Sequence, residues 1–243
     1  MNDPIVYAAK IDAGGALISD DSRGQLFPWW SLSKTVLAAC VLELVARGAW
    51  ALDGPLPGRR WTLRQLLQHR AGVPNYGRLA AYHEAVARGG EPWTVDDLLE
   101  RVGTELDFSP GAGWSYSNVG YFLVRQLIEE TMDAEIGGAL QRLIFDPLDR
   151  GSARLANEPG DLDRTAWGNS VGYHPGWVYH GLVIGTALDA ARLLDALVSG
   201  RLLPAELIDA MKTPHPLGGA LPGRPWQTHG YGLGLMIGRT AEA

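Results

Sequence analysis

Hydrophobic side chains between Thr35 and Val45 would cover nearly every side of a helix, and Glu43 is the only charged residue among them. A helix that is apolar all round lies inside a protein rather than on its surface. The segment begins directly after Ser31, and Gly48 supplies a plausible C-terminal cap. The pattern therefore predicts a buried central helix that starts at Ser31.

Shorter patterns predict strands near both ends of the chain and helices between them. Residues 5–9 and 16–19 are predicted strands of a hairpin, and residues 231–237 alternate with glycine as a late strand would. Pro28 is expected to stop any sheet before the central helix. Further helices are predicted by spacing and capping residues at 62–71, 94–102, 121–130, 136–144, 186–198 and 204–211, whereas residues 150–180 are expected to be irregular.

This order of elements predicts an α+β fold with an inserted helical region. We expect residues 1–58 and 180–243 to form a sheet-containing part, and residues 59–179 to form a mainly helical part. The 243 residues, with 46% hydrophobic and 20% charged residues, are enough to build a substantial core.

Composition and charge exclude several functional classes. The net charge of −6 and the lack of a basic run argue against a nucleic-acid partner. The apolar stretches are too short and interrupted to cross a bilayer, and the first residues lack signal-peptide features, so no membrane association and a cytoplasmic location are expected. Cys40, the single cysteine, lies within the apolar helix and is expected to pack in the core.

Ser31 and Lys34 are the first candidate for chemistry. They lie one helical turn apart, so their side chains share a face. A serine hydroxyl needs a neighbouring base, and a lysine is a base only where burial lowers its pKa. Lys34 is one of three lysines, and it lies within the predicted apolar helix rather than on the surface. The alternative is that Ser31 caps the helix while Lys34 extends to water.

A second motif, Tyr116-Ser117-Asn118, follows Pro110-Gly111. With Ser-x-x-Lys it resembles the serine β-lactamase and penicillin-binding-protein superfamily, most closely its class C-like branch, which includes esterases and D-amino-acid peptidases. The likeness covers nearly the whole chain. It extends to residues 66–74, similar to the family's LLxHxSGLP segment with Ala71 in place of serine, and to residues 110–121, 145–148 and 231–234.

The resemblance implies roles for individual residues. Ser31 would attack a carbonyl and form an acyl-enzyme, and Lys34 would take or relay its proton. Tyr116 would be a general acid or base, its phenol acidified by Lys34. Asn118 would hydrogen-bond to Lys34 or to the substrate. We further expect Trp30 and Trp177 to line the substrate site, although tryptophans that merely fill the core are an equal alternative.

The chain departs from this family at its end. The family's third motif, Lys-Thr-Gly or His-x-Gly, is expected soon after residues 231–237, and the chain reaches Ala243 without it. C-terminal strands are thus expected to be missing. A shortened chain, a partner chain that completes the sheet, or lost catalysis would each explain this, and we favour the first. A sheet without that strand would have an open edge, which permits self-association.

Competing motifs are weaker. Residues 168–172 match the Gly-x-Ser-x-Gly nucleophile elbow around Ser170, but the flanking residues do not form the strand and helix that an elbow requires. No histidine spacing indicates a metal site, and no glycine-rich phosphate loop is present, so no cofactor is expected. His69 and His180 are expected to be structural.

The sequence favours a serine hydrolase that acts on a small-molecule ester or amide, with an esterase or small-amide hydrolase ahead of a true β-lactamase or D,D-peptidase. A non-catalytic binding or scaffold protein with the same fold is the alternative from another functional class.

Overall fold

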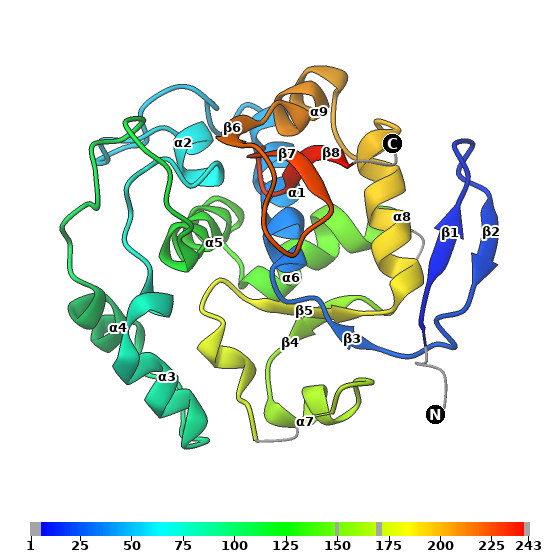
Figure 1. Cartoon of the computed structure of the whole chain (residues 1–243), viewed down its shortest axis with the longest axis horizontal. Helices are drawn as coiled ribbons and strands as arrows, with labels where there is room; N and C mark the ends of the chain where they lie inside the picture. Colours follow the sequence, from blue (N-terminus) through cyan, green and yellow to red (C-terminus); the bar gives the residue numbers. More distant parts are fainter. Residues whose placement is uncertain (1–5, 149–150, 169–171, 241–243) are drawn as a thin grey trace.

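The buried helix α1, Leu32–Ala46, lies at the centre of the molecule. The computed structural model describes residues 6–148, 151–168 and 172–240. From Ser33 to Leu42 every residue of α1 is buried, as expected for a helix with no polar face. The long helix α5, Asn118–Met132, packs against α1 (Figure 1). This pair forms the middle of the hydrophobic core.

The other helices surround this pair. They are α2 Leu63–Leu67, α3 Ala80–Ala87, α4 Val95–Val102, α6 Ile136–Leu140, α7 Pro159–Asp163, α8 Ala187–Val198 and α9 Ala205–Lys212. A π-helical segment, Gln141–Phe145, continues α6, and 3-10 turns lie at Tyr76–Arg78, Asp146–Leu148 and Pro175–Trp177.

The described strands form three small antiparallel sheets. The first is the hairpin of β1 and β2, the second has the order β3-β5-β4, and the third has the order β6-β7-β8. Their bounds are β1 Ala9–Ile11, β2 Leu17–Asp20, β3 Phe27–Pro28, β4 Arg154–Ala156, β5 Leu182–Gly185, β6 His215–Gly218, β7 Trp226–Tyr231 and β8 Met236–Thr240.

The start of α1 is held by the central strand β5. The backbone N–H of Trp29 donates to Val183 O at 2.8 Å. The N–H of Val183 donates in turn to the Ser33 hydroxyl at 2.9 Å, within the core. Because these bonds lie on both sides of residues 30–32, they fix the chain direction where α1 begins.

The turn between β7 and β8 packs closely on α1. The Thr35 hydroxyl donates to Gly234 O at 2.7 Å. Gly234 has φ +85°, and a Cβ there would lie 2.4 Å from the Cβ of Ala38, so only glycine permits this approach. Tyr231, at the end of β7, is thereby brought towards the start of α1.

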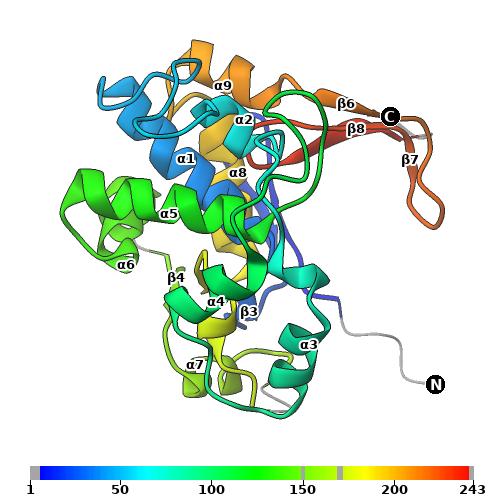
Figure 2. The same cartoon turned by 90° about the vertical axis from the view of Figure 1, so that its left-hand side faces the viewer.

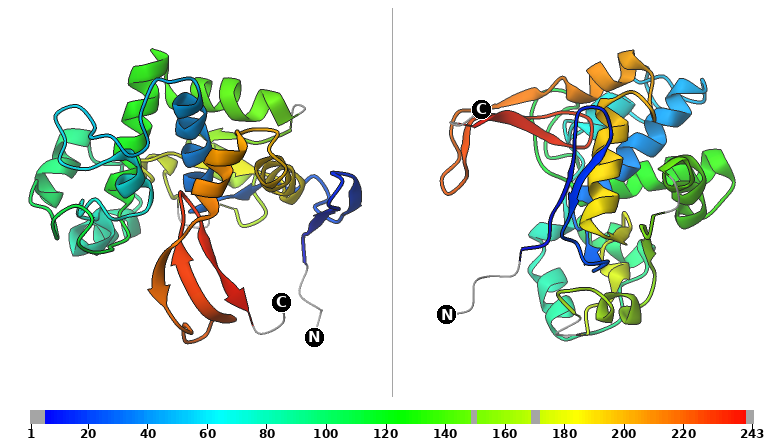
Figure 3. Two further views of the ribbon diagram at one scale, coloured as in Figure 1. Left: turned by 90° about the horizontal axis from the view of Figure 1, so that it is seen from above. Right: turned by 90° about the vertical axis from the view of Figure 1, so that its right-hand side faces the viewer.

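The two terminal sheets lie at the margin of the molecule. In Figure 2 the sheet β6-β7-β8 extends away from the helices. The right-hand view of Figure 3 shows the hairpin β1–β2 alongside α8. In the described part of the chain, no helix has both the length and the apolar character needed to cross a membrane.

The predicted α+β class is confirmed, with local corrections. The strand predicted at 231–237 is wrong, because the glycines of that segment form the turn between β7 and β8. Pro28 is the last residue of β3, so the strand ends just before the central helix, as expected. The segment 150–180 contains β4 and α7, and β4 shares a sheet with β3 and β5. The division into two parts stays a prediction.

Candidate active site

Ser31 stands at the N-cap position of α1 but does not cap it. Its side chain makes no cap hydrogen bond. Instead, Ser31 Oγ accepts a hydrogen bond of 2.9 Å from the hydroxyl of Tyr116. The preceding residue, Trp30, has φ +42°, a left-handed conformation that is strained for a tryptophan. The chain thus bears backbone strain at the point where it presents an exposed serine hydroxyl.

Lys34 is buried, and no carboxylate of the described residues forms an ion pair with it. The residue is 1% exposed, so its side chain does not extend to water. Nζ lies 3.1 Å from Nε2 of His180, and 4.9 Å and 5.8 Å from the ring centres of Tyr116 and Tyr121. Among the described residues no ion pair includes Lys34. Burial lowers the pKa of Lys34 from 10.5 to about 7.

Tyr116 is not acidified in this structure. Burial raises the pKa of its phenol above 10.0, and the hydrogen bond to Ser31 offsets this only in part. The expectation that nearby Lys34 would acidify the phenol is therefore wrong, because desolvation raises the pKa of the phenol and lowers that of the amine. A neutral phenol donates its proton, which agrees with the direction of the bond to Ser31 Oγ. Among the described residues, the hydrogen-bond partner of the Ser31 hydroxyl is thus Tyr116, and the side-chain partner of Lys34 is His180.

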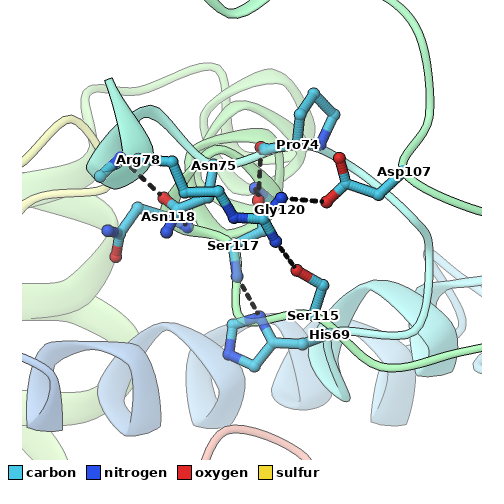
Figure 4. Close-up of polar contacts among 10 residues, drawn as sticks. His69, Pro74, Asn75, Arg78, Asp107, Ser115, Ser117, Asn118 and Gly120 are labelled. Atoms are coloured by element: carbon cyan, nitrogen blue, oxygen red, sulfur yellow. Dashed lines mark hydrogen bonds and ion pairs between the residues drawn. The ribbon is translucent and has the colours of Figure 1, made fainter. Parts of the chain in front are cut away.

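His69 holds Tyr116 in place from three directions. Its backbone carbonyl accepts from Ser115 N at 3.0 Å, and Nδ1 accepts from Ser117 N at 3.1 Å (Figure 4). Its ring lies 4.3 Å from the ring centre of Tyr116. Because Nδ1 is an acceptor, the proton of the neutral imidazole is on Nε2. Burial keeps the pKa of His69 well below 6.5.

The residues after Tyr116 form the start of α5. Ser117 caps this helix, accepting from Gly120 N and donating to Pro74 O, each at 2.9 Å. The N–H of Asn118 donates to Asn75 Oδ1 at 3.1 Å. Figure 4 shows these bonds together with those of Arg78, which pairs with Asp107 at 2.9 Å and donates to Ser115. The loop that carries Tyr116 is thus anchored on both sides.

The structure brings Ser31, Lys34 and Tyr116 together. Asn118 is next to this group in sequence, but the hydrogen-bond partner of Lys34 in the described residues is His180 rather than Asn118. Asn118 therefore stays a proposal as a substrate-binding residue.

The two predicted tryptophans lie in different surroundings. Trp30 is 42% exposed beside Ser31, and its ring meets Tyr173 edge-on at 5.5 Å. Trp177 is 1% exposed and packs 5.5 Å from Trp93 and 5.6 Å from Tyr82. Its indole N–H donates to Gly90 O at 3.0 Å. Trp30 is thus open to a ligand, whereas Trp177 is enclosed by aromatic rings.

Sequence reasoning missed His69 and His180 as neighbours of the catalytic candidates. His69 lies in the segment that resembles LLxHxSGLP, which was the available signal. Nothing in the residues next to His180 indicates contact with Lys34, 146 positions away. Ser170, of the competing elbow motif, lies outside the described residues. In the described ranges no group of three His, Cys, Asp or Glu could hold a metal ion.

Comparison with known proteins gives a consistent picture. The family model described as Beta-lactamase matches residues 15–243. A penicillin-binding protein of Bacillus subtilis is 29% identical over 159 residues, which cover 61% of this chain and 35% of that protein. Esterase EstB of Burkholderia gladioli is 29% identical over 146 residues, covering 51% and 36%. The chain spans about a third of the length of these two relatives.

A solved structure extends the likeness to the fold. A D-stereospecific amidohydrolase from a Streptomyces species superposes with a TM-score of 0.74 at 28% identity, covering 90% of this chain and 72% of that one.

Proposed function

Because the chain belongs to the beta-lactamase family, we propose that it is a serine hydrolase that forms an acyl-enzyme at Ser31 on an ester or amide. One observation carries this proposal. The Tyr116 hydroxyl donates a hydrogen bond of 2.9 Å to Ser31 Oγ, and Lys34, one turn further along α1, is buried. Ser31 and Lys34 at the start of α1 and Tyr116, 85 positions away in sequence, are the proposed nucleophile, base and acid.

The proton steps follow from the neutral states of these groups. Ser31 Oγ attacks the carbonyl carbon, and its proton passes to the lone pair of Lys34 Nζ. Tyr116 then donates its phenolic proton to the leaving group and regains a proton from the Lys34 ammonium, which restores both groups before water hydrolyses the acyl-enzyme. The backbone N–H of Ser31 lies at the N-terminus of α1, where the positive end of the helix dipole favours the developing oxyanion.

Esters and small amides are the proposed substrates. The relatives named an esterase and a D-stereospecific amidohydrolase support both classes. Trp30, exposed beside Ser31, supplies an apolar contact for the substrate, and Asn118 supplies a polar one. A true β-lactamase and a D,D-peptidase remain the alternatives within the family, separated by comparing turnover of penicillin, a D-amino-acid amide and p-nitrophenyl acetate.

Covalent labelling tests the proposal. A fluorophosphonate probe, followed by intact-mass measurement, should give one adduct per chain, and Ser31→Ala should give none. Ser170→Ala is the matched control and should keep the adduct, because the elbow motif is not the proposed nucleophile. An unlabelled wild type would favour the binding or scaffold alternative. An adduct lost only in Ser170→Ala would identify Ser170, and not Ser31, as the nucleophile.

Self-association and location are further parts of the proposal. β8 pairs with β7 on one side, and no other described strand pairs with it, so its outer edge is the proposed site for a second copy of this chain. Sedimentation should show a mass that rises with concentration, and a monomer at every concentration would contradict this. The cytoplasmic location is tested by cell fractionation.

A further inference from the structure

His180 is a buried polar residue with an unexplained position. It lies just before β5, which also fixes the start of α1 through Val183, and it is 3% exposed. Its Nε2 faces Lys34 Nζ at 3.1 Å, while its buried Nδ1 has no hydrogen-bond partner among the described residues. An apolar side chain would fill this place without leaving a buried polar atom unpaired. The histidine therefore calls for a functional explanation.

The direction of the contact follows from the lone pair of the amine. A neutral amine has a single lone pair, and Lys34 must turn it to the Ser31 hydroxyl to take a proton. Nζ must then donate to His180, so Nε2 is the acceptor and the imidazole proton is on Nδ1. The alternative, in which Nε2 donates to Nζ, would occupy the lone pair and block the base.

We propose that His180 is a positioning residue whose Nε2 accepts a hydrogen bond from Lys34 Nζ and stabilises the ammonium formed when Lys34 takes the Ser31 proton. In this step the O–H bond of Ser31 breaks and an N–H bond forms on Nζ, while Oγ bonds to the carbonyl carbon and the π electrons of the C=O bond move to its oxygen. The inference rests on the proposed function, because it assigns a role within that reaction.

Among the residues that the structure describes, no carboxylate faces the pair that could stabilise the ammonium in place of this hydrogen bond. The groups that face Lys34 and His180 are the phenols of Tyr116 and Tyr121, the imidazole of His69 and the more distant guanidinium of Arg125. Tyr231 of β7 packs against His69 from the other side. None of these is a carboxylate, and burial together with Lys34 holds the pKa of His180 well below 6.5. Burial therefore favours the neutral imidazole of His180, which can accept a hydrogen bond.

The pH dependence of labelling tests this role. The rate of Ser31 labelling by the fluorophosphonate probe should be measured from pH 5 to 9 for wild type, His180→Leu and His180→Gln. Removing an acceptor from a buried amine disfavours its ammonium form and so lowers its pKa. In His180→Leu the acid limb of the pH–rate profile, where the labelling rate falls as Lys34 is protonated, should therefore move about one pH unit or more towards lower pH. Its plateau rate should fall about tenfold or more, since the transient ammonium loses its partner.

Control variants separate this role from simple packing. His180→Gln keeps an acceptor oxygen, so it should return the limb close to the wild-type pH. His83→Gln, an exposed histidine elsewhere, should change neither limb nor plateau. If His180→Leu does not fold, His180→Met provides the same apolar test.

The outcomes decide between two ideas. A limb that stays at the wild-type pH in the apolar variant, or moves to higher pH, would overturn the inference while Ser31 labelling keeps the proposed function. A wild type that is not labelled at Ser31 would overturn both.

Discussion

The N-termini of α1 and α8 each bury an ionisable side chain, but in opposite ways. At α8 the carboxylate of Asp189, 7% exposed, accepts from Thr186 N at 3.0 Å, Thr186 Oγ1 at 2.9 Å and Ser152 Oγ at 2.6 Å. Thr186 completes a capping box with it. At α1 the amine of Lys34 has one hydrogen-bond partner in the described residues, the imidazole of His180. The Ser31 side chain makes no cap hydrogen bond there.

The difference separates a stabilising site from a reactive one. Four donors, the backbone N–H and hydroxyl groups of Thr186 and Ser152, stabilise the Asp189 carboxylate and hold the first turn of α8. Lys34 has no such compensation, so the folded protein favours its neutral form. Its pKa of about 7, against 10.5 for a free lysine, means that the unfolded chain binds more protons between those values. The unfolding free energy therefore rises with pH across this window, and at pH 7 Lys34 destabilises the fold.

Replacing Lys34 should have the largest effect on chemistry. Lys34→Met removes the base, so the rate of Ser31 acylation should fall by on the order of a thousandfold or more. Stability at pH 7 should rise by about 2–4 kcal/mol, because the uncompensated amine is gone, and the gain should shrink towards pH 10.5. Stopped-flow labelling and urea denaturation measure the two quantities. A variant that is both active and less stable would remove the distinction between the two helix starts.

Replacing Asp189 should have the opposite profile. Asp189→Ala leaves the donors of Thr186 and Ser152 unpaired in a buried place, so the unfolding free energy should fall by about 2–4 kcal/mol. The labelling rate per folded molecule should stay at the wild-type value. Glu206→Ala, an exposed acid in the first turn of α9, is the matched control and should change stability by less than about 1 kcal/mol. Slower labelling in folded Asp189→Ala would show that α8 is part of the reactive site.

The pH dependence of the wild type should show a smaller effect. Only neutral Lys34 accepts a proton, so the labelling rate should increase about tenfold per pH unit below 7 and level off above it. The probe's own hydrolysis and the labelling of Ser31→Ala serve as blanks. A rate that continues to rise towards pH 10 would show that the pKa of Lys34 is close to that of a solvent-exposed lysine, and the contrast with Asp189 would no longer hold.

The predictable part of the molecule is the part governed by local sequence. The apolar run after Lys34 predicted α1, and Thr62 and Gln65 predicted the capping box that α2 shows. The strands were harder, because β3, β4 and β5 are two to four residues long and depend on partners far along the chain. The turn after Tyr231 was missed since its glycines, which permit contact with α1, mimic strand alternation.

The site was predictable to the extent that motifs carry it. Ser31, Lys34 and Tyr116 were named from two short patterns, and the structure places them in one group. The contact between Lys34 and His180 depends on how β5 docks beside α1, which no local pattern encodes. The raised pKa of Tyr116 likewise follows from burial by distant segments.

The central claim is that Lys34 loses its proton near pH 7 within the folded protein, and lysine NMR tests it directly. The chain has three lysines, Lys10, Lys34 and Lys212, so side-chain labelling with 13C at Cε gives a spectrum simple enough to assign by Lys34→Met. The account predicts that one of the three signals titrates with a midpoint near 7 and is absent from the variant. Three signals that all titrate near 10.5 would contradict it.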